Sequence, residues 1–258
     1  MATKLQEVVA LIDRSGSMAG KVTDAVGGFN STLEVLREQK EETTQINVSV
    51  KLFDNEEEML IKSIPLNDVR PLEERQFVPR GQTALLDAMG NTLTYFMEKK
   101  LLNPDAYECC TIYVVTDGLE NCSKTFTQKR IKEIIKSAED KYNIKVIYLG
   151  ANQDAILEAT NLGINPGQAI NYTETKDQTS AAYRSAAAMV YRHRSGDTVA
   201  FTNIERQASQ CSSESPHTPS ALKSYSNYYD STQPLFNMGS TPSPPPVTRQ
   251  MPLPLQRM

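Results

Sequence analysis

The residues from Glu7 to Met18 read EVVALIDRSGSM. Six residues come first that are nearly all apolar, which is typical of a parallel strand buried on both faces. The run ends abruptly at Asp13, and Ser15 and Ser17 follow with one glycine between them. One side-chain oxygen is enough to cap a helix. A carboxylate and two hydroxyls at the tip of a strand therefore indicate a candidate binding site.

Strand and helix patterns alternate beyond this stretch. Strands are expected at residues 7–12, 46–53, 59–64, 111–115, 144–149 and 169–172. Helices are expected at residues 22–40, 84–102, 128–142, 155–162 and 178–194. The second and third strands are too close for a crossover helix, so they should form an antiparallel hairpin. The βαβ order elsewhere predicts an α/β fold with a mostly parallel sheet and helices on both faces.

The composition changes after about residue 206. Residues 207–258 contain nine of the fourteen prolines and ten serines, with only five charged side chains. Such a segment has little to bury, so we expect a folded domain at residues 1–206 and a disordered Pro/Ser-rich tail at 207–258. Val199 and Phe201, near the border, are candidates for a further short strand.

Charge and cysteine content limit the partners and the compartment. The net charge of −4 lacks the basic footprint of a nucleic-acid-binding protein. No apolar stretch approaches the roughly 20 residues that span a bilayer, and the first apolar run is too short for a signal peptide. Two of the four cysteines, Cys109 and Cys110, are adjacent, unlike a disulfide framework. We expect a cytoplasmic protein that binds neither nucleic acid nor membrane; its oligomeric state is left open.

Two further loops carry the same kind of side chain. In RGQTALLDA, Thr83 stands just before a predicted helix, and in VVTDGLEN, Asp117 stands just after a predicted buried strand. Ligands of open α/β sheets bind beyond the carboxyl ends of the strands. If the strands that end at Asp13 and near Asp117 are neighbours, two carboxylates and three hydroxyls converge there.

These three motifs, in this order at these element ends, resemble the von Willebrand factor type A domain over roughly residues 5–196, and in particular its standalone bacterial and phage cytoplasmic forms. The resemblance implies a Rossmann-like, doubly wound six-stranded sheet of order 3-2-1-4-5-6 with an antiparallel edge strand. It also implies a metal-ion-dependent adhesion site that binds Mg²⁺ or Mn²⁺. The family's ligand positions fall on Asp13, Ser15, Ser17, Thr83 and Asp117.

The resemblance implies a non-catalytic, protein-binding module. Three hydroxyls would ligate the ion directly and the two aspartates largely through water, which leaves the ion under-neutralised. An Asp or Glu of a partner protein would then complete its shell. Gly16 is expected to permit the turn between the serines, and Gly118 to let the backbone approach the site.

Other interpretations of the same residues remain. Singly, Asp13, Ser17 and Thr83 would also suit helix caps, and Asp117 a turn. A Mg²⁺-dependent phosphohydrolase could use Asp13 as its nucleophile, although the second aspartate of that pattern is replaced by Ser15. A scaffolding protein with a structural metal is the third alternative.

Four further polar residues near these motifs have less definite expected roles. Glu120 and Asn121 are expected to face either the ligand or solvent. Asp87 is expected on the helix surface or behind the ligands. His193 is expected to be exposed rather than catalytic.

Overall fold

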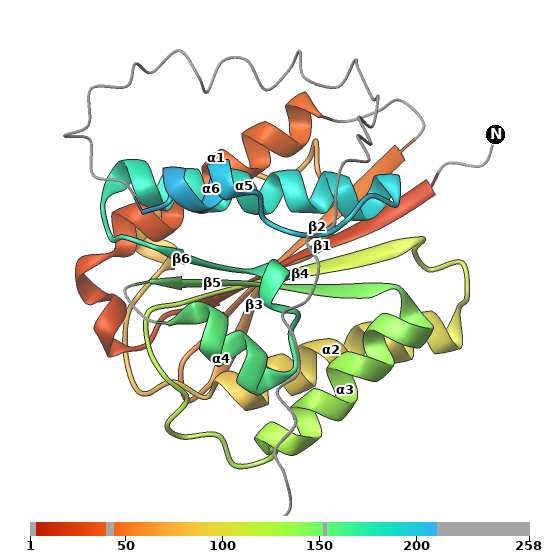
Figure 1. Cartoon of the computed structure of the whole chain (residues 1–258), viewed down its shortest axis with the longest axis horizontal. Coiled ribbons are helices and arrows are strands. Elements are labelled where there is room, and N and C mark those ends of the chain that lie inside the picture. The colour runs from red at the N-terminus through yellow and green to blue at the C-terminus, as the bar shows by residue number, and fades with distance from the viewer. Residues whose placement is uncertain (1–3, 40–43, 152–153, 211–258) are drawn as a thin grey trace, which may run out of the picture. The chain divides into compact units, whose positions relative to one another are not determined.

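The computed structural model describes residues 4–39, 44–151 and 154–210. These residues form one six-stranded sheet in the order β3-β2-β1-β4-β5-β6, with helices on both faces (Figure 1). The strands are β1 (Lys4–Asp13), β2 (Thr44–Phe53), β3 (Glu57–Pro65), β4 (Cys109–Thr116), β5 (Ile144–Ala151) and β6 (Ala169–Tyr172). The helices are α1 (Val22–Glu38), α2 (Leu85–Leu102), α3 (Gln128–Tyr142), α4 (Ala155–Leu162), α5 (Lys176–Ser195) and α6 (Asn203–Ala208).

The predicted fold class is confirmed. β3 is antiparallel to β2, and the other neighbouring strands are parallel. Three short 3₁₀ turns, at Gly16–Gly20, Glu74–Gln76 and Pro166–Gln168, were not predicted. The predicted end of the first helix at residue 40, and residues 211–258 of the tail predicted at 207–258, lie outside the described residues.

A short helix, α6, crosses the predicted domain border, so residues 207 and 208 of the predicted tail are helical. The described residues 197–202 before it contain no strand at Val199 or Phe201. Thr202 starts α6 through a capping box with Glu205, which favours a helix here. Glu205 also pairs with Arg192 of α5 at 2.7 Å, which fastens α6 to α5. Phe201 is buried without strand pairing.

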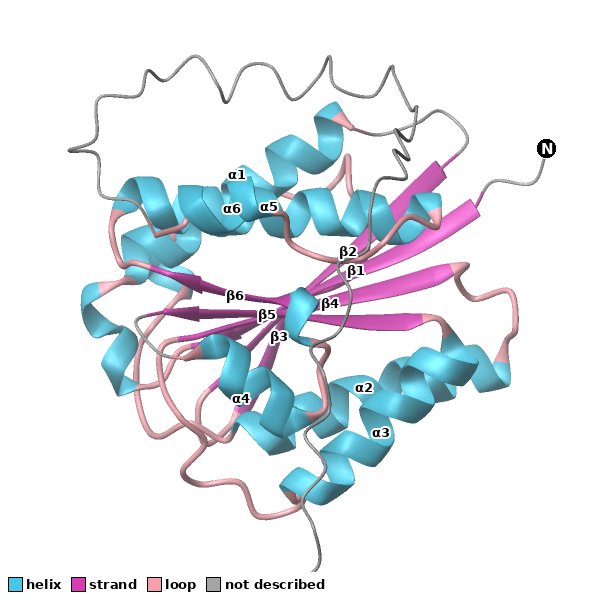
Figure 2. Ribbon diagram, in the orientation of Figure 1, coloured by secondary structure: helices cyan, strands magenta, loops and turns pink. Residues whose placement is uncertain are grey.

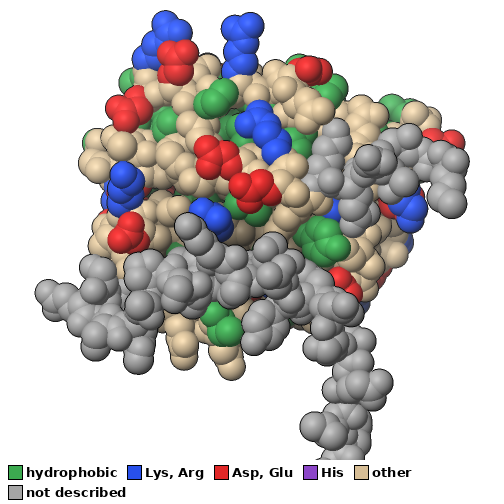
Figure 3. Space-filling model, turned by 90° about the horizontal axis from the view of Figure 1, so that it is seen from above, with side chains coloured by type: hydrophobic (Ala, Val, Ile, Leu, Met, Phe, Trp, Pro, Cys, Tyr) green, Lys and Arg blue, Asp and Glu red, His purple; other side chains and the backbone are tan. Residues whose placement is uncertain are grey.

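The helices form two layers, with α1, α5 and α6 on one face of the sheet and α2, α3 and α4 on the other (Figure 2). On the outer face of the first layer, described side chains of both charges are interspersed with apolar ones (Figure 3). Within the described ranges, no helix combines the length and the apolar character needed to cross a membrane.

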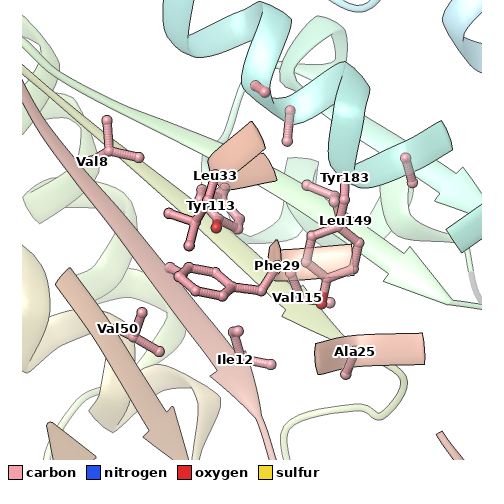
Figure 4. Close-up of a cluster of buried hydrophobic side chains, with 14 of the residues drawn as sticks. Val8, Ile12, Ala25, Phe29, Leu33, Val50, Tyr113, Val115, Leu149 and Tyr183 are labelled. Atoms are coloured by element: carbon pink, nitrogen blue, oxygen red, sulfur yellow. The ribbon is translucent and has the colours of Figure 1, made fainter. Parts of the chain in front are cut away.

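Close packing holds α1 and α5 against the sheet (Figure 4). Phe29 and Tyr183 are fully buried between the helices and the strands, and the rings of Tyr183 and Tyr113 meet edge to face with centroids 6.4 Å apart. A Cβ on Gly28 would lie 2.4 Å from the Tyr183 ring. Glycine is therefore required at this helix crossing, because any side chain would displace the aromatic ring.

The register of the central strands places the candidate loops together. Ile12 of β1 lies opposite Val115 of β4, and both strands run in the same direction. Asp13 and Asp117 therefore emerge at the same edge of the sheet. The chain passes from β1 to β2 on one side and returns to β4 on the other, so this edge is a topological switch point.

His193 is buried, so the prediction that it is exposed is wrong. Its Nδ1 lies 2.8 Å from the hydroxyl of Thr111, and its Nε2 lies 3.0 Å from Oδ1 of Asn143. The Asn143 amide nitrogen already donates to the carbonyl of Glu108, so its oxygen accepts from Nε2–H. These groups lie at the beginning of β4 and β5, at the edge opposite the candidate site. The network holds His193 neutral.

Burial, with a smaller contribution from the charge of Lys145, lowers the pKa of His193 to about 4 from its ordinary 6.5. Between these pH values the unfolded chain binds a proton that the folded chain does not, so stability falls as the pH falls. The full difference corresponds to about 3 kcal/mol. Urea denaturation at pH 7, 5.5 and 4 should show a smaller loss for His193→Gln than for the wild type. Equal losses would contradict this assignment.

Candidate metal site at the carboxyl edge of the sheet

The first loop folds back on the aspartate that ends β1. Asp13 is fully buried, and its Oδ1 accepts a hydrogen bond from the backbone N–H of Ser15 at 2.7 Å. The 3₁₀ turn that follows brings the hydroxyls of Ser15 and Ser17 to 3.0 Å from each other. Three oxygen-bearing side chains of one short loop are thus gathered beside β4.

The loop after β4 joins this group. The Ser17 hydroxyl donates to Oδ1 of Asp117 at 2.7 Å. The Thr116 hydroxyl donates to Oδ2 of Asp13 at 2.6 Å, so the end of β4 also orients the aspartate of β1. Thr116 was not predicted as a site residue, because only the strand pairing places it opposite Asp13.

The position of Gly118 shows that Thr83 reaches the same place. A Cβ on Gly118 would lie 3.3 Å from Oγ1 of Thr83, 3.8 Å from Oγ of Ser17 and 3.9 Å from Oδ2 of Asp13. Oxygen atoms from two separate loops therefore surround one point on the third loop, and a side chain on Gly118 would press on them. This agrees with the predicted role of Gly118.

Gly16 does not have its predicted conformational role. Its φ is not positive, and a Cβ there would meet only the carbonyl of Gly81, at an ordinary 3.5 Å. The turn between the serines is a 3₁₀ turn, which most residues can adopt.

The hydroxyls of this cluster are not used as helix caps. Neither the turn that begins after Ser15 nor α1 nor α2 receives a side-chain capping bond at its N-cap position. The structure brings together all five residues proposed as ligands from the sequence, namely Asp13, Ser15, Ser17, Thr83 and Asp117.

This donor set fits a hard divalent cation. All its side-chain donors are oxygens, as Mg²⁺ and Mn²⁺ prefer, and it offers neither nitrogen nor sulfur. No group of three or more His, Cys, Asp or Glu suited to a metal occurs among the described residues, so hydroxyls have to contribute. Burial raises the pKa of Asp13 despite its hydrogen bonds with Thr116 and Ser15, and the charge of Asp117 raises it further. A cation would relieve both costs.

Two residues expected to face ligand or solvent instead hold the loop of Thr83. Asn121 exchanges two hydrogen bonds with the backbone of Thr83, at 2.9 and 3.1 Å. Glu120 accepts from the backbone N–H of Leu86 in the first turn of α2 and from two N–H groups of its own loop. Asp87, also in that first turn, accepts from three consecutive N–H groups at 124–126. The loop after β4 is thereby fixed to the start of α2.

A buried ion-pair network fixes the same loops from the other side. Arg14, between Asp13 and Ser15, donates to Oδ2 of Asp54 at 2.9 Å, and Arg80 donates to the same oxygen at 2.9 Å. The backbone N–H of Arg80 donates to the carbonyl of Arg14, and that of Ala84 to the carbonyl of Asp54. The β2–β3 turn, through Asp54, therefore links the loop that carries Ser15 and Ser17 (the serine loop) to the loop that carries Thr83.

Comparison of the sequence with protein-family models and with curated proteins found no match. Among solved structures, the pilus adhesin SpaC from Lactobacillus rhamnosus GG aligns with a TM-score of 0.57 at 11% identity, over 74% of this chain and 30% of that chain. A von Willebrand factor type A structure from Catenulispora acidiphila aligns with a TM-score of 0.50 at 14% identity, over 74% of this chain and 43% of that one.

A third structure, proximal thread matrix protein 1 from the mussel byssus, has a TM-score of 0.48 at 14% identity, over 71% and 45% of the two chains. The chain spans less than half the length of each of these three proteins. At such identities the likeness concerns the fold alone. The fold, with its strand order and antiparallel edge strand, is that of a von Willebrand factor type A domain.

Proposed function

We propose that this chain is a von Willebrand factor type A protein whose carboxyl-edge site binds Mg²⁺ or Mn²⁺ and captures an acidic side chain of a partner protein. The observation that carries the proposal is the convergence of Thr83, Ser17 and Asp13 oxygens around the missing side chain of Gly118. The similarity to SpaC, which is named a pilus adhesin, supports a role in protein binding.

The residues have distinct tasks in this proposal. The hydroxyls of Ser15, Ser17 and Thr83 are the direct ligands. Asp13 and Asp117 hold water that completes the shell, and Asp13 also orients the serine loop through the N–H of Ser15. The bound cation supplies a Lewis-acidic, incompletely neutralised position for an anionic oxygen. A carboxylate gains Coulombic attraction and coordination there, whereas a neutral side chain lacks the charge.

We propose binding rather than catalysis because hydrogen bonds fix the side chains around the site and no histidine among the described residues lies there. His193 lies at the opposite edge with both ring nitrogens in hydrogen bonds, and His217 is outside the described residues. Both oxygens of Asp13 accept hydrogen bonds from its own domain. This arrangement suits an orienting ligand better than a phosphoryl-accepting nucleophile.

Partner capture should need both the ion and Thr83. Thr83→Ala removes one hydroxyl from the cluster, while its backbone contacts with Asn121 remain, so binding should weaken at least tenfold and folding little. Immobilised full chain would be incubated with its source lysate in MgCl₂ or in EDTA, and the proteins retained only with Mg²⁺ would be identified.

Each captured protein would then be retested with single Asp→Asn and Glu→Gln changes. Thr94→Ala, in the middle of α2, is the matched control. The proposal predicts that EDTA, Thr83→Ala and one amide substitution each release the partner and that Thr94→Ala does not. Binding that survives the first three changes would place the contact elsewhere.

A further inference from the structure

Lys21 lies between the serine loop and α1, directly after the 3₁₀ turn. Its ammonium forms ion pairs with two carboxylates, that of Asp117 at the end of β4 and that of Glu174 between β6 and α5. The side chain of Asp117 is 1% exposed, and those of Lys21 and Glu174 are about one quarter exposed. The positive charge of Lys21 thus lies next to Asp117, one of the residues proposed to bind the metal.

The two oxygens of Asp117 have different partners. Oδ1 accepts from the Ser17 hydroxyl, and Oδ2 accepts from Lys21. A lysine side chain is charged at neutral pH, and both of its partners here are carboxylates. The positive charge of Lys21 offsets the negative charge of Asp117, which would otherwise attract a divalent cation.

A small hollow adjoins this lysine. It is lined by Met18, Lys21, Asp24, Ala25, Tyr172, Glu174 and Thr179. Two carboxylates, Asp24 and Glu174, thus line the same hollow as Lys21. The ammonium has an alternative acidic environment if its bond with Asp117 breaks.

We propose that Lys21 is a tethered counter-ion that competes with the divalent cation for Asp117. It neutralises the carboxylates when the cation is absent, and it lowers the affinity of the site for the cation. The inference rests on the proposed function. Two cations close together in a partly buried site repel strongly, and both would be neutralised by the single negative charge of Asp117.

Replacing the ammonium by an apolar chain of similar length tests this competition. Lys21→Met should bind Mg²⁺ and Mn²⁺ at least tenfold more tightly than the wild type. Lys21→Arg keeps the charge and should stay within about threefold of the wild type. Lys4→Met is the matched control, because Lys4 pairs with Glu108 at the opposite edge of the sheet. The measurement is calorimetric titration of each full chain with MgCl₂ and MnCl₂.

Thermal unfolding in EDTA gives a second readout without metal. Lys21→Met should melt at a lower temperature than Lys4→Met, because Asp117 and Glu174 then face each other without a cation. Adding Glu174→Gln should restore part of the loss. If Lys21→Met is unfolded without metal, the double variant Lys21→Met/Glu174→Gln takes its place in the titration.

The outcomes separate this inference from the proposed function. Tighter metal binding by Lys21→Met than by the wild type supports the inference. It does so even if the wild type binds no ion. In that case the result would overturn metal-dependent capture by the native chain. Equal affinities of wild type and Lys21→Met would overturn the inference and leave the proposed function intact. Absence of binding by every variant would overturn both.

Discussion

Asp54→Ala should lower the free energy of unfolding by about 3 kcal/mol, a larger loss than we expect from any other single substitution in the loops around the site. The Asp54 side chain is fully buried and accepts from Arg14, whose side chain is 4% exposed. Removing one partner of a buried ion pair leaves the other charge without compensation. Glu58 pairs with Arg14 as well, which keeps the cost at the lower end of the usual range.

Urea denaturation at neutral pH measures this loss. The two arginines and the N–H of Glu56 outweigh burial and hold the pKa of Asp54 below its usual value, so the carboxylate is charged at this pH. Glu56→Ala is the matched control: Glu56 pairs with the same Arg80, but both side chains are more than half exposed, so its loss should stay below about 1 kcal/mol. Equal losses in the two variants would contradict a structural role for the network.

The polarity pattern of the strands made the sheet predictable. Runs such as EVVALI and TIYVV are apolar because β1 and β4 are buried on both faces, and their ends coincide with the motif residues. The proximity of Asp13 and Asp117 was predictable from the same pattern, because the carboxyl ends of parallel strands lie at one edge of the sheet. The ligand roles of the proposed site residues, and the cytoplasmic location, stay predictions.

The residues that support the site were not predictable in this way. Arg14 and Asp54 are 40 positions apart in sequence, and Lys21 and Asp117 are 96 apart. Each reads locally as a polar loop residue, and only the packing of loops at one edge makes them partners. The burial of His193 was missed for the same reason. Its partners Thr111 and Asn143 lie at the beginning of β4 and β5, at the sheet edge opposite the candidate site.

Asp13→Asn should abolish the stabilisation of the chain by Mg²⁺ or Mn²⁺ while leaving a folded protein. A ligand that binds only the folded state adds about 2.7 kcal/mol at a hundredfold excess over its Kd. The asparagine keeps the size of Asp13 and an acceptor for the N–H of Ser15, but it removes the charge. Thermal unfolding with and without MgCl₂ measures the response.

The control for this experiment is Asp105→Asn, which changes an exposed aspartate between α2 and β4, at the opposite edge. It should respond to the ion as the wild type does. An unchanged response of Asp13→Asn would remove Asp13 from the site.

The most direct test of the ion site is the anomalous scattering of manganese in crystals of the wild-type chain grown with MnCl₂. We predict one strong peak within coordination distance of the hydroxyl oxygens of Ser15, Ser17 and Thr83. Crystals of Asp13→Asn grown in the same way should lack it. A wild-type crystal with no peak among these residues, or with its only peak elsewhere on the domain, would contradict the account.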